Sequence, residues 1–432
     1  MMKHYLKNIT PDSLSGYIFA LEGMQGGIVL LNGPTGCKFY HSATSDYQTM
    51  KQLAFDTLNY PESWFFGQSR VPCTYLDARD YVYGSRDKIE EALLFISNEM
   101  QFDFLAVVNS PGAALIGDDI KGIVKSVLPE IPCVVIESPG FSENICEGYD
   151  RGAVEIISQL CGESNRDREA SSLSVNLLGM SIFERNHEGD FKEIKRMLAL
   201  CGIKVNCVLF DGCSLSELRS LNRAALNVVI HPEYAKKTAD FLKEQYSIPA
   251  YVAAPPIGFY AVEKMASEIC ALIGASAERL LIESEKSRAR AYIYMSRFNS
   301  LTGLPKGSTF GIEGNWATAY AYTLFLWKYF GLVLKGVAIL NEECTPWKAE
   351  FLQLVEKCRC ESALQNRELR ECEMVFANGN TISKLKLEGE NFIGIENGLP
   401  SLGYVDVIAK THMGLHGALF LVEQIINGLA MK

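Results

Sequence analysis

The chain has 432 residues, of which 48% are hydrophobic and 21% charged, with a formal net charge of −10. This is a globular composition in a chain too long for one core, so we expect two or three domains. No Lys/Arg-rich tract stands out, which argues against a nucleic-acid or membrane partner. The N-terminus lacks the apolar core of a signal peptide and no apolar run could span a bilayer, so we expect a cytoplasmic protein. The 13 cysteines lack a disulfide spacing, and we expect free thiols.

Short β-branched runs alternate with amphipathic helical segments along the whole chain. Several of the runs are apolar throughout, which is typical of strands covered on both faces in a parallel sheet. The expected strands are 27–31, 104–109, 133–137, 175–178, 205–210, 226–230, 250–253, 309–312, 337–340, 374–377 and 392–395.

This alternation predicts an α/β protein with three doubly wound parallel-sheet (Rossmann-like) domains around a central cleft. The expected domains are residues 1–168, 169–276 and 277–432. The polar stretch 163–172 is predicted to be the first linker, and a charged helix over 277–297 leads into the third domain. The last helix, over 412–429, is apolar enough to pack back on another domain.

The first candidate for chemistry is the turn Gly33-Pro34-Thr35-Gly36-Cys37, which follows an apolar strand and opens a predicted helix. Glycine allows the backbone to approach a bulky group closely. A cysteine at a helix N-terminus has its thiolate favoured by the helix dipole, as a cluster ligand or reactive thiol requires. Taken alone, the motif favours the simpler interpretation of an ordinary strand-to-helix turn with a buried cysteine.

The order of the segments that follow favours the functional interpretation of Cys37 over the simpler one. They are Cys73 to Ser85, then Asn109-Ser110-Pro111-Gly112 continuing to Ile116-Gly117-Asp118-Asp119, then Glu137-Ser138-Pro139-Gly140, and finally Gly414-Leu415-His416-Gly417. This order resembles the component-1 superfamily of nitrogenase, which includes molybdenum–iron protein subunits, their cofactor-assembly homologues and dark-operative protochlorophyllide reductase subunits. The resemblance covers most of the chain and is looser in the third domain.

The resemblance implies a [4Fe–4S] cluster at an interface between related subunits, with Cys37 as a ligand. Around it, the resemblance places Gly33, Pro34 and Gly36 in the turn, Lys38, Tyr40 and His41 as tuning residues, and Gly117, Asp118 and Asp119 beside the cluster, the two aspartates as helix caps.

Two departures from the family pattern reduce the expected cysteine set to one. The family's other cysteine positions fall near Ser13 and at Pro111. Cys73 is the best substitute ligand, since the resemblance implies that its segment runs near the same site in the family fold. Two cysteines per chain, doubled by a two-fold axis, would supply the four thiolates of a [4Fe–4S] cluster. The alternatives are that a different partner subunit supplies the missing ligands and that Cys73 is only a buried spacer.

Histidines give weaker signals. His231 aligns where catalytic molybdenum–iron subunits carry a cofactor-binding cysteine, and its imidazole can ligate a metal or donate protons. The simpler interpretation is a strand-end residue before Pro232. The departure from cysteine argues against a molybdenum–iron cofactor bound in that way, and so against a nitrogen-fixing enzyme. His412 and His416 could bind a metal together only if the last helix begins early enough for them to share a face.

The leading hypothesis is a component-1-like oxidoreductase subunit, as a homodimer or within an α2β2 assembly with a homologous subunit. The resemblance implies that it would receive electrons from a separate ATP-dependent iron protein, and no Walker motif for ATP is evident in the sequence. It would reduce a small or tetrapyrrole-like substrate in the inter-domain cleft, where a second metallocofactor or a tetrapyrrole could bind. The alternatives are a non-catalytic metallocofactor carrier or assembly scaffold, and a cluster-free α/β binding protein.

Overall fold

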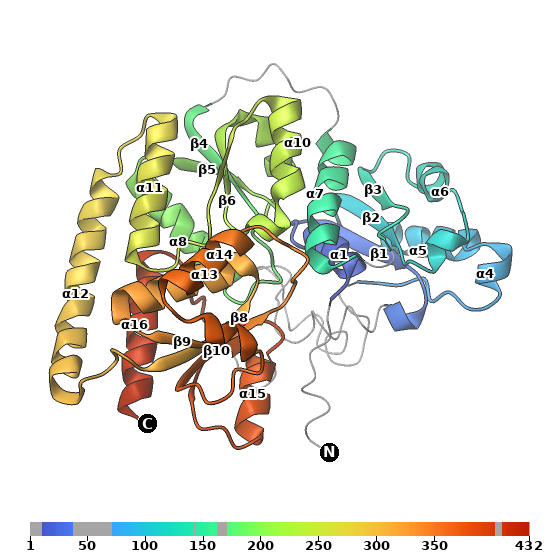
Figure 1. Ribbon diagram of the computed structural model, residues 1–432. Coiled ribbons are helices and arrows are strands. Elements are labelled where there is room, and N and C mark those ends of the chain that lie inside the picture. Colours follow the sequence, from blue (N-terminus) through green and yellow to red (C-terminus); the bar gives the residue numbers. More distant parts are fainter. Residues whose placement is uncertain (1–10, 38–70, 141–142, 162–170, 402–407, 432) are drawn as a thin grey trace.

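The computed structural model describes residues 11–37, 71–140, 143–161, 171–401 and 408–431. Within these ranges the strands form three separate sheets, each with all of its strands parallel. Helices cover the sheets, and the first sheet lies to one side of the other two (Figure 1). The three parallel sheets confirm the predicted α/β fold.

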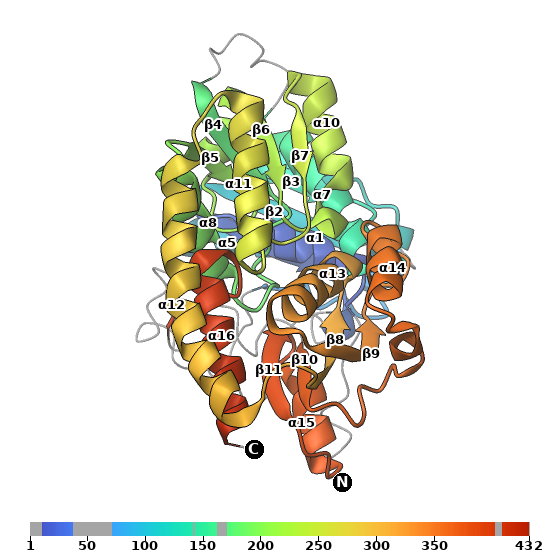
Figure 2. The same ribbon diagram turned by 60° about the vertical axis from the view of Figure 1, so that its left-hand side comes forward.

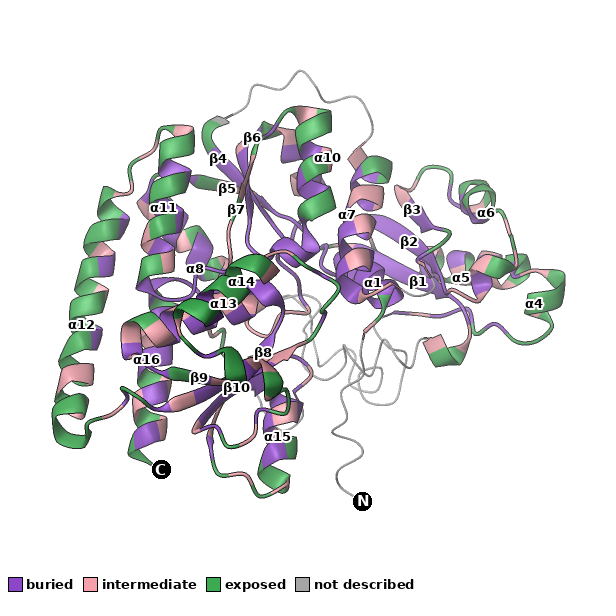
Figure 3. Ribbon diagram, in the orientation of Figure 1, coloured by how far each residue is buried: buried purple, intermediate pink, exposed green. Residues whose placement is uncertain are grey.

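The first sheet has the order β1-β2-β3, and residues of β1 pair in register with β2 from Gly27–Phe104 to Asn32–Asn109. Every residue of β1 and β2 is buried, because helices cover both faces (Figure 3). Its strands are β1 (Gly27–Asn32), β2 (Phe104–Asn109) and β3 (Cys133–Ile136). Its helices are α1 (Ser13–Glu22), α4 (Asp80–Tyr83), α5 (Arg86–Glu99), α6 (Ile120–Val127) and α7 (Ile145–Cys161).

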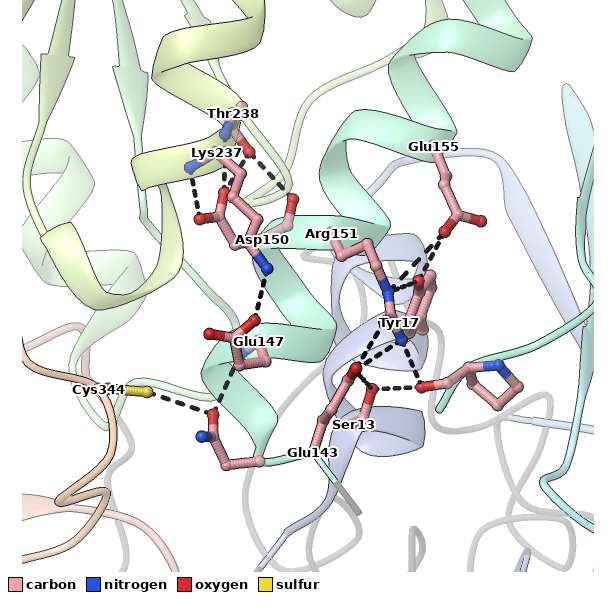
Figure 4. A network of polar contacts seen from close by, with 12 residues as sticks. Ser13, Tyr17, Glu143, Glu147, Asp150, Arg151, Glu155, Lys237, Thr238 and Cys344 are labelled. Atoms are coloured by element: carbon pink, nitrogen blue, oxygen red, sulfur yellow. Dashed lines mark hydrogen bonds and ion pairs between the residues drawn. The ribbon is translucent and has the colours of Figure 1, made fainter. Parts of the chain in front are cut away.

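The second sheet has the order β5-β4-β6-β7. Its strands are β4 (Ser171–Leu178), β5 (Lys204–Val208), β6 (Ala224–Val229) and β7 (Ala250–Val252). The helices that follow its strands are α8 (His187–Leu200), α9 (Leu215–Leu218), α10 (Lys236–Tyr246) and α11 (Phe259–Ile273). The carboxylate of Asp150 in α7 accepts from the backbone N–H groups of Lys237 and Thr238 at 2.7 and 2.8 Å, which ties α7 to the start of α10 (Figure 4).

The long helix α12 (Glu278–Thr302) leads to the third sheet, which has the order β11-β10-β8-β9. Its strands are β8 (Thr309–Gly314), β9 (Val333–Ile339), β10 (Met374–Asn378) and β11 (Ile393–Gly398). Its helices are α13 (Trp316–Phe325), α14 (Lys348–Lys357) and α15 (Gly379–Leu387), followed by α16 (Gly414–Ala430). The last helix, α16, packs against α8, α11 and α12 (Figure 2).

The predicted strands are all present, with small shifts at their ends. The largest shifts are at β4 and β9, which begin at Ser171 and Val333 rather than at 175 and 337. Most of the predicted linker lies outside the described residues, and its last two residues belong to β4 instead. The domain boundaries at 168 and 276 stay predictions. Among the described helices, none is both long and apolar enough to cross a membrane.

Candidate functional site

The candidate site lies where β1 ends. Beyond this strand, residues 35–37 are helical, so Cys37 stands in the first turn of a helix as expected. A short extended segment runs parallel to the end of β1, with Leu31 paired to Cys73 and the N–H of Leu76 donating to the carbonyl of Gly33 at 3.0 Å. The Cys73 thiol donates to that same carbonyl at 3.0 Å. The fold therefore brings Cys73 to the turn that carries Cys37, across 36 positions of sequence.

The two thiols differ in exposure, and their surroundings keep Cys37 protonated. Cys37 is half-buried and Cys73 is buried. Burial raises the pKa of Cys37, and the nearby Cys73 adds to this, while a hydrogen bond with Ser110 acts in the opposite direction. The thiolate expected from the helix dipole is therefore not favoured here, because desolvation outweighs the other effects. A bound metal ion would reverse this balance, since a coordinating thiol is deprotonated.

Ser110 and Tyr81 complete this cluster and were not singled out in the sequence. Ser110 directly follows β2, so its side chain reaches the edge where parallel strands end. A Cβ on Gly33 would lie 2.6 Å from the Ser110 hydroxyl, and glycine is therefore required at this close approach. Tyr81 interacts electrostatically with Cys37 and hydrogen-bonds Ser110, and burial raises the pKa of its phenol. Two signals in the sequence could have identified Ser110: its position directly after a strand end, and its place in the segment Asn109-Ser110-Pro111-Gly112.

The other residues that the sequence placed around the cluster differ in their surroundings. The Pro34 carbonyl accepts from the N–H of Cys37 at 3.2 Å. Gly36 is exposed, and a Cβ placed there would meet nothing within 4 Å among the described atoms. Gly117, at φ +80°, is likewise exposed and open. Lys38, Tyr40 and His41 lie outside the described residues.

Asp118 and Asp119 act at helix starts, as the sequence suggested, but at different helices. The side chain of Asp119 accepts from the N–H of Gly122 at 2.9 Å and caps α6. The Asp118 carboxylate instead accepts from both the N–H and the hydroxyl of Ser85, at 2.6 and 2.7 Å, just before α5. Both carboxylates are engaged in holding helix starts, so a role at a cluster stays a prediction.

Replacing Asp118 with alanine should lower the free energy of unfolding of the first domain by about 1–3 kcal/mol, because Ser85 is buried and would lose the acceptor of two hydrogen bonds. The measurement is urea unfolding together with hydrogen exchange of peptides from α5. Asp119→Asn is the matched control, since asparagine caps helices about as well as aspartate. Equal midpoints for the two variants would contradict the assignment.

The positions at which the resemblance places the family's other cysteines are Ser13 and Pro111. Ser13 is buried at the start of α1, and its hydroxyl donates to the carbonyl of Pro139 (Figure 4). Its neighbour Asp12 interacts electrostatically with Cys37, so this position lies in the same region. Pro111 directly follows Ser110. Both substituted positions therefore lie near the two thiols.

Exposed apolar side chains border this cluster. We call them the apolar rim: Tyr75, Tyr81, Val82, Tyr83 and Leu115, with exposed fractions of 39, 38, 73, 82 and 75%. They come from the segment after Cys73, from α4 and from the turn after Ser110. Exposed apolar groups gathered in one place are typical of an interface with another protein.

His231 lies elsewhere, at the junction of the second and third sheets. It stands two residues beyond the end of β6 and is 3% exposed, and neither ring nitrogen has a hydrogen-bond partner among the described residues. Burial lowers the pKa of its imidazole. It lines a small cavity of about 20 Å³ together with Glu184, Asp190, Tyr322 and His412.

Two carboxyl groups with raised pKa values lie near this junction. Burial raises the pKa of Asp190 to about 7, and the Glu184 carboxylate adds to this. Burial likewise raises the pKa of Glu233 to about 7. His187 Nδ1 lies 2.7 Å from Asp211, and His412 Nδ1 lies 2.6 Å from the Tyr322 hydroxyl. Of these groups, Asp190 and Glu233 can hold and exchange protons near neutral pH.

His412 and His416 do not form a pair. Helix α16 begins at Gly414, so His412 lies before it and is buried against Tyr322. His416 is exposed and pairs with Glu193 at 3.0 Å. The i,i+4 metal site considered from the sequence is therefore absent.

A family model described as "Nitrogenase component 1 type Oxidoreductase" matches residues 13–430. The chain belongs to this family. Among curated relatives of this component-1 chain, a light-independent protochlorophyllide reductase subunit of Bradyrhizobium sp. (strain BTAi1) is 30% identical over 224 residues, 50% of the chain and 43% of the relative. The corresponding subunit of Methylobacterium radiotolerans is 29% identical over 211 residues, 48% of the chain and 40% of the relative. These matches span less than half of the relatives' length.

The solved structure titled "Nitrogenase Cp1 at pH 6.5" has the same fold as this component-1 chain. Its TM-score is 0.75 at 16% identity, and the match covers 98% of this chain and 94% of that chain. At this identity the likeness concerns the fold alone.

In this component-1 chain, the described residues could supply half of the ligands of an iron–sulfur cluster. Cys37 and Cys73 offer two of the four thiolates that a [4Fe–4S] cluster takes. The described part of the chain holds no group of three or more His, Cys, Asp or Glu side chains able to bind a metal. The cavity beside His231 has room for about one water molecule and does not fit a second metallocofactor or a tetrapyrrole.

Proposed function

We propose that the chain is a reductase subunit of the component-1 type that receives low-potential electrons through a [4Fe–4S] cluster shared with a second chain. The observation that carries this proposal is the convergence of Cys37 and Cys73 at the end of β1, beside the apolar rim. Two thiols are half of the ligands that the cluster needs, and the exposed apolar side chains beside them could contact a second chain. The second chain would then supply the other two ligands. When bound, such a cluster accepts and donates electrons at low potential.

The protein's own residues would hold and shield the cluster. Cys37 and Cys73 are the ligands, and no described atom lies within 4 Å of a Cβ placed on Gly36, so none of these atoms would obstruct a bulky group there. Hydrogen bonds to cluster sulfurs tune potential, and Ser110 stands next to Cys37 for this purpose. The apolar rim would exclude water once a partner covers it. The partner is a second copy or a homologous subunit, in a homodimer or an α2β2 assembly.

The electron donor would be a separate ATP-dependent iron protein, as the membership of the component-1 family suggests. Reduction also consumes protons, and Asp190, whose pKa burial raises to about 7, would supply them at the cavity near neutral pH. The neutral imidazole of His231 would pass them on, and Glu233 lies close by as a second buried carboxyl group. The substrate at this junction is small, since the cavity is small. His231 is the proposed catalytic residue, because its ring nitrogens have no other partner among the described residues.

Iron and sulfide content with electron paramagnetic resonance, on protein purified anaerobically alone and with its partner, tests the proposal. We expect one [4Fe–4S] cluster per pair of chains, with its signal lost in Cys37→Ala and in Cys73→Ala because each removes a ligand. Cys133→Ala is the matched control: Cys133 is also half-buried but lies at the start of β3, at the opposite end of the sheet. Wild-type protein without iron, or a signal that survives in Cys37→Ala, would refute the proposal.

The second candidate is a non-catalytic carrier or assembly scaffold, which the small cavity beside His231 favours. It predicts a cluster bound by the same thiols and its transfer to an acceptor protein. Steady-state turnover with reductant, ATP and the iron protein would exclude it, and His231→Ala should then abolish that turnover while the cluster signal remains.

A further inference from the structure

A groove of about 450 Å³ lies between the second and third sheets, far along the chain from the thiols. Strand β7 and helix α11 form one side, and α13, the π-helical turn Leu326–Phe330 and α14 form the other (Figure 2). This volume falls within the roughly 300–1,000 Å³ that is typical of small-molecule sites. No residue of the first sheet lines the groove, so the inference does not depend on the proposed cluster.

Aromatic rings form the walls of this groove. Tyr320 and Trp347 pack with ring centroids 4.9 Å apart at an interplanar angle of 43°. Tyr260 is 50% exposed, and the ammonium of Lys328 lies 3.5 Å from its ring centroid. Trp327 lines the same groove. Rings presented to an open groove, rather than buried in a core, are available to stack on a flat ligand.

The backbone departs from regular geometry at the two points that place these rings. Trp327 and Lys328 lie in the π-helical turn at the end of α13. Such turns are rare and occur frequently at functional sites. Trp347 has φ +66°, a left-handed conformation that a bulky residue rarely adopts. Strained residues of this kind concentrate at ligand-binding positions.

The groove also carries positive charge on a protein whose net charge is −10. Its lysines are Lys264, Lys328 and Lys357, and its carboxylates are Glu268 and Glu350. Glu268 accepts from the Tyr251 hydroxyl at 2.6 Å and lies 4.0 Å from Lys264. Within the described ranges, Lys328 and Lys357 have no carboxylate partner; each lies over an aromatic ring instead. These two ammonium groups are free to bind an anion.

A second hollow of about 280 Å³ adjoins the groove and shares Tyr260 and Lys328 with it. Its lining includes Arg288, which is paired with Glu263. A ligand whose ring lies in the groove therefore has room for an arm that passes Lys328.

We propose that this groove binds a flat aromatic molecule that carries a phosphate or carboxylate arm. The ring would stack between Tyr260 and the Tyr320–Trp347 pair. The anionic arm would lie against Lys328 and Lys357. Stacking would select the flat ring, and charge-assisted hydrogen bonds would select the anionic arm. We therefore expect a neutral molecule with the same ring to bind more weakly.

Titration of the full chain with flavin mononucleotide and with riboflavin tests this proposal, because the two probes share one ring and differ in the phosphate. We expect one flavin mononucleotide per chain, with a dissociation constant on the order of 1–100 μM and quenched flavin and tryptophan fluorescence. Riboflavin should bind about tenfold more weakly. Lys328→Gln combined with Lys357→Gln should weaken flavin mononucleotide about tenfold and leave riboflavin unchanged, while Trp347→Leu should weaken both.

Lys195→Gln is the matched control, since Lys195 also lies over an aromatic ring, that of Phe191 on α8, at 5.2 Å. It should leave both affinities unchanged. The proposal is overturned if wild-type protein binds neither probe, if the phosphate makes no difference, or if the lysine variants behave like the control. Circular dichroism of Trp347→Leu separates loss of the ring from loss of the fold, and the lysine variants test the site independently of it.

Discussion

Replacing Gly148 with alanine should lower the free energy of unfolding of the first domain by about 3 kcal/mol or more. Gly148 lies in α7 where this helix crosses α1, and a Cβ there would be 2.1 Å from the carbonyl oxygen of Ser13 and 2.5 Å from its Cα. Gly16 faces α7 in the same way, 2.4 Å from the carbonyl oxygen of Ile145. Both obstacles are backbone, so no side chain can rotate to make room.

Polar contacts hold this crossing closed and raise the cost of separating the helices. Arg151 donates to the Tyr17 hydroxyl at 2.6 Å, and that hydroxyl donates to Glu155 at 2.7 Å (Figure 4). Ser13, at the start of α1, donates to the carbonyl of Pro139. Because α1 leads directly into β1, a displaced α1 also disturbs the strand end that positions Cys37.

Thermal unfolding together with hydrogen exchange of α1 and α7 peptides measures this effect. Ser158→Ala is the matched control, because Ser158 is exposed on the same helix and its loss removes only a bond to Val154 within the helix. Faster exchange in α1 and α7 of Gly148→Ala, with the control unchanged, is the expected result. A Gly148→Ala melting temperature equal to that of the control would contradict this account of the crossing.

The strands were predictable because each is a short run of apolar, largely β-branched residues between turn signals. The end of β4 nearest the linker was not, since Ser171 and Ser172 carry no such pattern and are placed by pairing with β6. Periodicity likewise gives no indication that Cys73 lies against the Gly33 turn, because their pairing joins segments far apart in sequence. Only the resemblance to a family suggested it.

The aromatic groove was beyond sequence reasoning for a different reason. Trp327 and Trp347 resemble ordinary apolar positions of helices in the sequence. Their exposure to the groove follows from a π-helical turn and from a left-handed residue, and tertiary packing determines both. The same holds for Glu233: nothing in its neighbourhood in sequence indicates that its carboxyl group is buried under the start of α13.

Replacing Glu233 with glutamine should stabilise the protein at pH 8 by on the order of 2–3 kcal/mol and leave it unchanged below pH 4.5. Glu233 Oε1 accepts from the N–H of Ala317 at 2.8 Å, while Oε2 is buried with no hydrogen-bond partner in the described ranges. Burial raises the pKa of this carboxyl from 4.5 to about 7, and the neighbouring Glu184 adds to the shift. Glutamine keeps the acceptor and carries no charge.

The direction of the pH dependence follows from which state holds the proton. Between pH 4.5 and 7 the folded protein keeps the Glu233 proton and the unfolded chain does not, so wild-type stability falls as pH rises through this window. Above pH 7 the folded protein contains a buried charge and the loss is complete. Urea unfolding from pH 4 to 8.5 measures the difference, with Glu91→Gln, at an exposed site on α5, as the control that should show none. A stabilisation of equal size at pH 4 and pH 8 would mean that the gain comes from packing rather than from the titration of this carboxyl.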